Sequence, residues 1–207
     1  MRLFVLGATG KTGGALVAQA LARGHNVTSF GRSPFAGSER AKVLSISGNP
    51  MSEMELSDAL PGHDAVLSVL GTRGLGATSV LKDSARVTIS AMRKAGVRRL
   101  AILSSALLDS NIGLMASFAA RTFLRHHSSD QRAMERLVTA SDLDWTVLRS
   151  PRMKDSAPPG ESTVIIGEPS DAKGMLITKE EVARVMLNTV ESGSHIREIV
   201  HVRGARR

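Results

Sequence analysis

A glycine-rich loop near the start of the chain, residues 7–13 with the sequence GATGKTG, limits the possible folds more than any other stretch. It follows Arg2–Leu6, a short apolar run that is typical of a buried parallel strand. It precedes residues 14–23, in which apolar side chains recur at helical spacing. Where a strand turns through glycines directly into a helix, the backbone can approach a phosphate and the first N–H groups of the helix can bind it. The loop therefore predicts an α/β protein that binds a nucleotide pyrophosphate.

The spacing of these glycines leaves other interpretations to consider. It is G-x-x-G-x-x-G, whereas the simplest dinucleotide fingerprint is G-x-G-x-x-G. Gly10-Lys11-Thr12 resembles the end of the phosphate-binding motif G-x-x-x-x-G-K-[ST], but that motif requires a glycine where this chain has Val5. That motif is therefore excluded. A tight strand–helix turn without a ligand is the remaining alternative.

Beyond the loop, short apolar runs alternate with segments of helical periodicity, which is the pattern of a doubly wound parallel sheet. Strands are expected at residues 25–30, 42–47, 64–70, 98–103, 144–149, 163–166 and 198–202, and helices at 52–60, 79–94, 129–141 and 179–191. No linker, repeat or low-complexity stretch divides the chain. We therefore interpret residues 1–207 as a single α/β domain of the Rossmann type, with residues 109–128 and 150–178 as the lid and loops on the substrate side.

The end of the second expected strand indicates which dinucleotide is bound. In Rossmann folds an acidic residue at this point accepts a hydrogen bond from the ribose 2′-hydroxyl of NAD. This chain has no acid there and has Arg32 instead. A guanidinium matches a 2′-phosphate in charge and in geometry. The expected cofactor is therefore NADP(H), with Arg40 and Lys42 as additional basic groups nearby.

Composition narrows the cellular location and the class of partner. The chain contains no cysteine, and no apolar run approaches the ~18 residues of a membrane helix. We therefore expect a cytoplasmic protein with no membrane partner. The formal net charge is +8, but the basic residues are scattered and aromatic residues make up 3% of the chain, too few to build base-stacking surfaces. We expect no nucleic-acid partner, attribute the charge to attraction of a phosphorylated cofactor or anionic substrate, and expect a monomer or weak homodimer.

Further motifs follow one another in the order and at the spacing of a known family. They are GATGKTG at 7–13, Arg32 after the second strand, LGTR at 70–73, AMRKAGV at 91–97, the pair Ser104-Ser105 after the fifth strand and WTVLRSP at 145–151. Together they resemble the atypical short-chain dehydrogenase/reductase superfamily, and within it the NAD(P)H-binding branch of the biliverdin reductase B and flavin reductase type. The resemblance covers nearly the whole chain.

This resemblance implies roles for individual residues. Gly7, Thr9, Gly10, Lys11 and Thr12 would hold the cofactor pyrophosphate, Arg32 its 2′-phosphate, Asn49 its adenine, Leu70, Gly71 and Arg73 its middle, and Ser104, Arg152 and Met153 the nicotinamide. Ser105 matches the serine that orients the substrate or delivers a proton, and Ser104 is the second candidate catalytic residue. The chain departs from the family pattern at Asn49, where aspartate is usual, and at Gln131 and Arg152, where relatives carry histidines near the cofactor.

The chain has no tyrosine, which excludes the mechanism of ordinary short-chain dehydrogenases, where a tyrosine activated by a lysine is the general acid. The chemistry that remains is reduction of a flat conjugated acceptor, such as a flavin, a quinone or a linear tetrapyrrole. The apolar segment 112–123 could cover such a ring. His126 and His127 are interpreted as surface residues, and no metal site is expected. The alternative is a non-catalytic NADP(H)-binding regulator or assembly factor.

Overall fold

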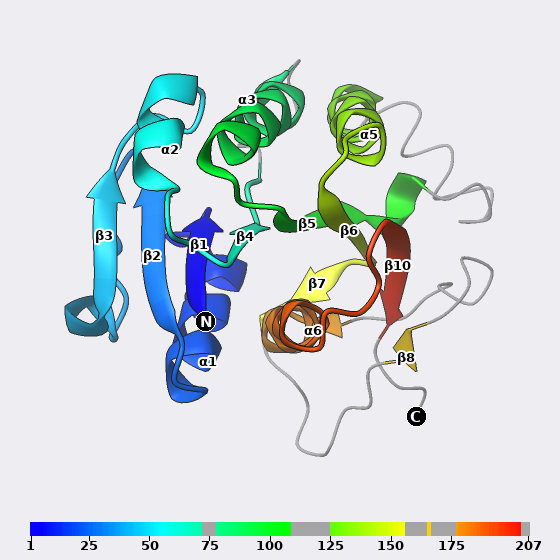
Figure 1. The fold of residues 1–207 in the computed structure, drawn as a ribbon. Helices are drawn as coiled ribbons and strands as arrows, with labels where there is room; N and C mark the ends of the chain where they lie inside the picture. Colours follow the sequence, from blue (N-terminus) through cyan, green and yellow to red (C-terminus); the bar gives the residue numbers. More distant parts are fainter. Residues whose placement is uncertain (72–77, 109–124, 156–164, 167–176, 204–207) are drawn as a thin grey trace.

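Strand β1 (Arg2–Leu6), which precedes the glycine loop, lies inside a sheet with the order β3-β2-β1-β4-β5-β6-β10-β8 (Figure 1). The structure is a computed structural model that describes residues 1–71, 78–108, 125–155, 165–166 and 177–203. The other strands are β2 (Asn26–Gly31), β3 (Val43–Ser47), β4 (Ala65–Ser68), β5 (Arg99–Ser105), β6 (Asp144–Ser150), β8 (Ile165–Ile166) and β10 (Glu198–Arg203). All neighbours pair in parallel except β8, which is antiparallel to β10. The predicted doubly wound sheet of the Rossmann type is confirmed.

The strand order changes direction at β1. From there β2 and β3 extend the sheet to one side, while β4, β5, β6 and β10 extend it to the other. Sheets of this kind bind their ligands outside the carboxyl ends of the strands, at this switch point. The residues that follow the parallel strands lie along one side of the sheet, which we call the C-terminal edge. Gly10, Arg32, Gly71 and Ser104 all lie on this edge.

Helices cover both faces of the sheet (Figure 1). One face is covered by α1 (Lys11–Ala22) and α6 (Lys179–Glu191), and the other by α2 (Glu53–Ala59), α3 (Val80–Ala95) and α5 (Arg125–Thr139). Two hydrophobic cores follow from this arrangement. Leu16 and Val182 belong to the core under α1 and α6, and Leu56 and Met134 belong to the core under α2, α3 and α5. No helix within the described ranges is both long and apolar enough to cross a membrane.

Several helix ends follow directly from the local sequence. Ser52 caps α2 by accepting the N–H of Glu55. Thr178 and Glu181 form a complete capping box at the start of α6. Gly96 follows α3 with φ +71°, a left-handed conformation that glycine adopts without strain. These signals are local, so the sequence located these ends closely.

Other boundaries differ from the expectation. Helix α1 begins at Lys11 instead of residue 14. Its first turn includes Gly13 and Gly14, although glycine has a poor helix propensity. Helix α5 begins at Arg125, four residues before the expected start. The structure adds a two-stranded parallel pair, β7 (Met153–Lys154) with β9 (Ile177–Thr178), which is too short to leave a periodic signal. Residues 109–124, which include most of the expected lid, lie outside the described residues.

Candidate functional site

The glycine loop between β1 and α1 is held by close backbone contacts. Gly7 has φ +85°, and a Cβ at this position would lie 2.8 Å from the carbonyl group of Val69, which follows β4. A Cβ on Gly13 would lie 2.1 Å from the carbonyl oxygen of Gly7. The N–H of Gly10 donates to that same oxygen at 3.0 Å. The loop can therefore close only with glycine at positions 7 and 13, and it starts α1 at the switch point of the sheet.

The start of α1 has the properties of an anion-binding site. Its N-cap is Gly10, which offers no side chain, and the first turn contains no acidic residue. The first N–H groups of a helix have no partner inside the helix, and the helix dipole adds partial positive charge there. Thr9, Gly10 and Lys11 are exposed at this point, while Thr12 is buried. These residues fit a phosphate group.

The segment that follows β6 contacts the start of α1. The hydroxyl of Thr12 lies 3.8 Å from the sulfur of Met153, and Lys11 pairs with Asp155 at 2.6 Å. The same carboxylate also pairs with Lys179, the first residue of α6. One carboxylate thus joins the N-terminal ends of two helices. Arg152 is exposed beside it.

Arg32 and Asn49 follow neighbouring strands at the C-terminal edge. Arg32 comes directly after β2, its side chain is exposed, and no ion pair joins it to another described residue. Asn49 follows β3, where its side-chain oxygen accepts the N–H of Met51 at 3.0 Å and its own N–H donates to Glu55 at 2.9 Å. The turn after β3 therefore holds Asn49 in place, next to the strand that Arg32 follows.

The strand at the other side of the switch point supplies Leu70 and Gly71. Leu70 is half-buried and packs on the core under α3, and Gly71 is exposed, with open space where a Cβ would stand. Both follow β4, next to the glycine loop. Arg73, the third residue expected at the middle of the cofactor, lies outside the described residues.

Ser104 and Ser105 are the last two residues of β5, within the strand instead of after it. Successive side chains of a strand point to opposite faces of the sheet, so the two hydroxyls face different sides. Ser104, on the side of α3 and α5, is 4% exposed, and its hydroxyl has no hydrogen-bond partner. Ser105 is half-buried. The expectation that both serines lie beside the nicotinamide remains a prediction.

Two acidic residues of α5 organise the surroundings of Ser104. Glu135 accepts two hydrogen bonds from Arg149, at 3.0 and 2.6 Å, and Arg149 is the register neighbour of Ser104 on β6. Asp130 accepts the backbone N–H groups of Leu81 and Lys82 at the start of α3. Sequence reasoning missed both residues, because neither a helix-to-helix cap nor an ion pair to a strand leaves a local pattern.

The profile of the family described as NAD(P)H-binding matches residues 7–192, which is most of the chain and includes the glycine loop, Arg32 and both serines. The chain belongs to the NAD(P)H-binding family. The predicted membership of an NAD(P)H-binding family is thereby confirmed.

Solved structures of similar fold cover almost the whole of this NAD(P)H-binding protein. A short-chain dehydrogenase/reductase from Veillonella parvula in complex with NADP has a TM-score of 0.81 at 16% identity, over 97% of this chain and 93% of that one. A protein named as a candidate NADH-flavin reductase from Streptococcus pneumoniae has a TM-score of 0.78 at 22% identity, over 99% and 100%. The anaerobillin reductase ChuY from Escherichia coli O157:H7 has 0.79 at 18%, over 100% and 98%. At these identities the likeness shows the fold alone.

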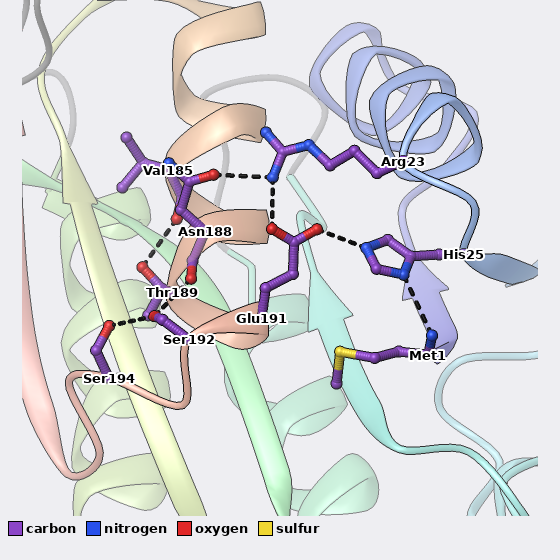
Figure 2. Close-up of polar contacts among 9 residues, drawn as sticks. All are labelled: Met1, Arg23, His25, Val185, Asn188, Thr189, Glu191, Ser192 and Ser194. Atoms are coloured by element: carbon purple, nitrogen blue, oxygen red, sulfur yellow. Dashed lines mark hydrogen bonds and ion pairs between the residues drawn. The ribbon is translucent and has the colours of Figure 1, made fainter.

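The opposite edge of the NAD(P)H-binding domain carries a separate polar cluster that joins α1 to α6 (Figure 2). Arg23 pairs with Glu191 at 2.7 Å and donates to Asn188 at 2.8 Å, and His25 lies 2.5 Å from the other oxygen of Glu191. Burial of Glu191 favours the neutral acid, but the hydrogen bond to His25 and the charge of Arg23 outweigh it, so the pKa of Glu191 lies below its ordinary value of 4.5. This cluster joins the ends of two helices far from the C-terminal edge.

Proposed function

We propose that this protein is an NADPH-dependent reductase of a flat conjugated acceptor, such as a flavin, a quinone or a linear tetrapyrrole. One observation carries the proposal: the C-terminal edge combines an uncapped helix start, suited to a pyrophosphate, with a buried serine hydroxyl that has no partner. Buried polar groups are normally hydrogen-bonded, so an unpartnered hydroxyl in this position supports a ligand that reaches from the glycine loop to the end of β5. A dinucleotide has this form.

The choice of NADP(H) over NAD(H) rests on Arg32. Its guanidinium is exposed directly after β2, where the ribose of the cofactor would lie, and no described acid neutralises it by an ion pair. Gly7, Thr9, Gly10, Lys11 and Thr12 would hold the pyrophosphate and Asn49 the adenine. Leu70, Gly71 and Arg73 would line the middle of the cofactor, and Ser104, Arg152 and Met153 the nicotinamide end. When bound, the nicotinamide would supply a hydride.

The absence of tyrosine from the chain shapes the proposed chemistry. Without a tyrosine as general acid, the acceptor must be one that water or a weak donor can protonate after hydride transfer. Flavins, quinones and linear tetrapyrroles meet this requirement. Ser105 would orient the acceptor through its hydroxyl. Two structural neighbours, one named for NADH-flavin reduction and one for anaerobillin reduction, support this class of acceptor.

The test is a binding and turnover measurement on the full chain. We expect NADPH to bind more tightly than NADH in calorimetry, and NADPH oxidation to accelerate with at least one acceptor among riboflavin, FMN, menadione and biliverdin. A parallel reaction with the Arg32→Ala variant at limiting NADPH should be slower, which separates turnover at this site from oxidation in free solution. Small aldehydes are the negative controls and should not be reduced, because their reduction requires a stronger proton donor.

A second function, a non-catalytic NADP(H)-binding regulator or assembly factor, is favoured by the same lack of tyrosine. The two functions predict different results in the acceptor panel. Tight NADPH binding without acceleration by any acceptor contradicts the reductase and supports the regulator. A rate that saturates with acceptor and falls in the Arg32→Ala variant supports the reductase.

A further inference from the structure

A single carboxylate, that of Asp155, pairs with two lysines at the N-terminal ends of neighbouring helices. One of its oxygens lies 2.6 Å from the Nζ of Lys11, the first residue of α1. Its other oxygen pairs with Lys179, the first residue of α6. Both helices cover the same face of the sheet (Figure 1). Lys11 also belongs to the glycine loop, so Asp155 holds a lysine that the proposed function assigns to the cofactor pyrophosphate.

The position of Asp155 is fixed by contacts that do not involve Lys11. The two residues before it form β7, which pairs with β9 directly before α6. The sulfur of Met153 in β7 lies 3.8 Å from the hydroxyl of Thr12. The side chain of Lys179 is only 18% exposed, so this partner of the carboxylate is itself packed against the protein. Asp155 is thus held from the side of α6.

Lys11, in contrast, can change its partner at small cost. Its side chain is 72% exposed, and an exposed ion pair contributes little, because water screens both charges. A lysine carries one compact charge on a flexible chain, which can turn towards another anion. The first N–H groups of α1 attract a phosphate to this same helix start. A pyrophosphate bound there would compete with Asp155 for the ammonium group of Lys11.

We propose that Asp155 limits the affinity of the protein for its cofactor by competing with the pyrophosphate for Lys11, and that it thereby speeds cofactor release. The inference rests on the proposed function, because it concerns the cofactor of that same site. Differences in affinity between related complexes lie mostly in the dissociation rate, so a weaker hold on the pyrophosphate shortens the time that the oxidised cofactor stays bound. Asp155 acts through Lys11 and is therefore a positioning residue.

The first test measures cofactor binding with no acceptor present. Asp155→Asn removes the charge and keeps the size of the side chain. Calorimetry gives the dissociation constants of NADPH and NADP⁺, and stopped-flow displacement, followed by NADPH fluorescence, gives the dissociation rate. We expect Asp155→Asn to bind both cofactors about fivefold more tightly, the upper end of the range for an exposed ion pair. The dissociation rate should fall by a similar factor.

A double-mutant cycle shows whether this effect passes through Lys11. Lys11→Met should weaken NADPH binding on the order of tenfold, because the pyrophosphate loses a charged partner. Adding Asp155→Asn to Lys11→Met should then change the dissociation constant by less than about twofold, within the scatter of additive effects. An equal gain from Asp155→Asn in both backgrounds overturns the inference, because the carboxylate would then act on the cofactor by its charge alone.

Two controls locate the effect. Glu180→Gln removes an exposed acid from the residue after Lys179, in the same first turn of α6, and should leave NADPH affinity within about twofold. Inorganic pyrophosphate, measured as a competitor of NADPH, should gain the same factor as the cofactor in Asp155→Asn. Adenosine 2′-monophosphate lacks the pyrophosphate and should gain nothing. A gain for this nucleotide overturns the inference, because Asp155 would then act at a different part of the site.

Weaker NADPH binding by Asp155→Asn also overturns the inference, because the carboxylate would then hold Lys11 where the cofactor needs it. Asp155→Ser repeats the test with a smaller uncharged side chain, so one misfolded variant does not decide the result. Tighter binding by these variants in a protein that oxidises NADPH with no acceptor supports the inference and contradicts the reductase. Unchanged affinity in a protein that does reduce acceptors overturns the inference alone, and no NADPH binding by the unaltered protein overturns both.

Discussion

The carboxylate of Asp130, on α5, accepts the backbone N–H of Leu81, the second residue of α3, at 3.1 Å. Its other oxygen accepts the N–H of Lys82 at 2.9 Å, and the aspartate is 4% exposed. A side chain of one helix thus caps another helix. The negative charge also lies at the positive end of the α3 dipole.

Replacing Asp130 with alanine should destabilise the protein by about 2 kcal/mol, because two N–H groups at a buried helix start lose their acceptor. For a chain of this size that corresponds to a melting temperature lower by roughly 4–8 °C. Asp58→Ala, an exposed aspartate on α2, is the control and should change stability by less than about 0.5 kcal/mol. Equal melting temperatures for the two variants in thermal unfolding would contradict this assignment.

Adjacent glycines at the start of α1 should respond to alanine in opposite directions. A Cβ on Gly13 would overlap the backbone of Gly7, whereas a Cβ on Gly14 would meet nothing within 4 Å. Gly13→Ala should therefore lower the free energy of unfolding by about 1–3 kcal/mol and weaken NADPH binding. Gly14→Ala should raise the free energy of unfolding by about 0.4–1 kcal/mol, because alanine favours the helix. Urea titration measures both, and destabilisation by Gly14→Ala is the result that contradicts the geometry.

Arg32→Ala should remove most of the preference for NADPH over NADH. A hydrogen-bonded charge pair of this type contributes roughly 1.5–3 kcal/mol, which is on the order of ten- to a hundred-fold in affinity. The NADH dissociation constant should change little, because NADH has no 2′-phosphate. Arg136→Ala, an exposed arginine in the last turn of α5, controls for the loss of one positive charge. The unaltered protein binding both cofactors equally in calorimetry would refute the assignment.

Ser105→Ala distinguishes two roles of this serine in the proposed reaction. If the hydroxyl only orients the acceptor, the activation free energy calculated from kcat/KM should rise by about 1 kcal/mol, the size of one neutral hydrogen bond. If it delivers the proton, the loss should be nearer 10²- to 10⁴-fold. NADPH affinity should be almost unchanged in either case. An unaltered kcat/KM for every acceptor that the protein reduces would remove Ser105 from the candidate site.

Glu191 should make the protein less stable in acid. Its pKa is lowered on folding, so the unfolded chain binds its proton more tightly, and stability rises with pH through this range. The contribution is complete above the ordinary value of 4.5 and is lost as the pH falls towards the lowered pKa. Glu191→Gln should cost about 1 kcal/mol at pH 7 and less at pH 3.5. Glu180→Gln, an exposed residue on the same helix, should show no such difference in urea unfolding.

Much of the fold was predictable because its signals are local. The alternation of apolar runs and helical periods indicated the doubly wound sheet, and the capping residues Ser52 and Thr178 and the stop at Gly96 lie where the chain itself carries the information. The β7–β9 pair and the early start of α5 were not predictable. The β7–β9 pair depends on a contact between two segments that are distant in sequence.

The candidate site also has features that the sequence predicts and features that only the tertiary structure shows. The glycines at positions 7 and 13 could be recognised from their spacing, because a strand–loop–helix turn constrains neighbouring residues. The role of Arg32 at a 2′-phosphate stays a prediction. The sequence by itself determined the class of fold, the nucleotide loop and the exclusion of tyrosine chemistry. Only the tertiary structure joined Lys11 to Asp155 and Lys179, and left Ser104, Ser128 and Gln131 buried without partners. Such groupings depend on strand register and helix packing, which bring together side chains that no sequence spacing relates.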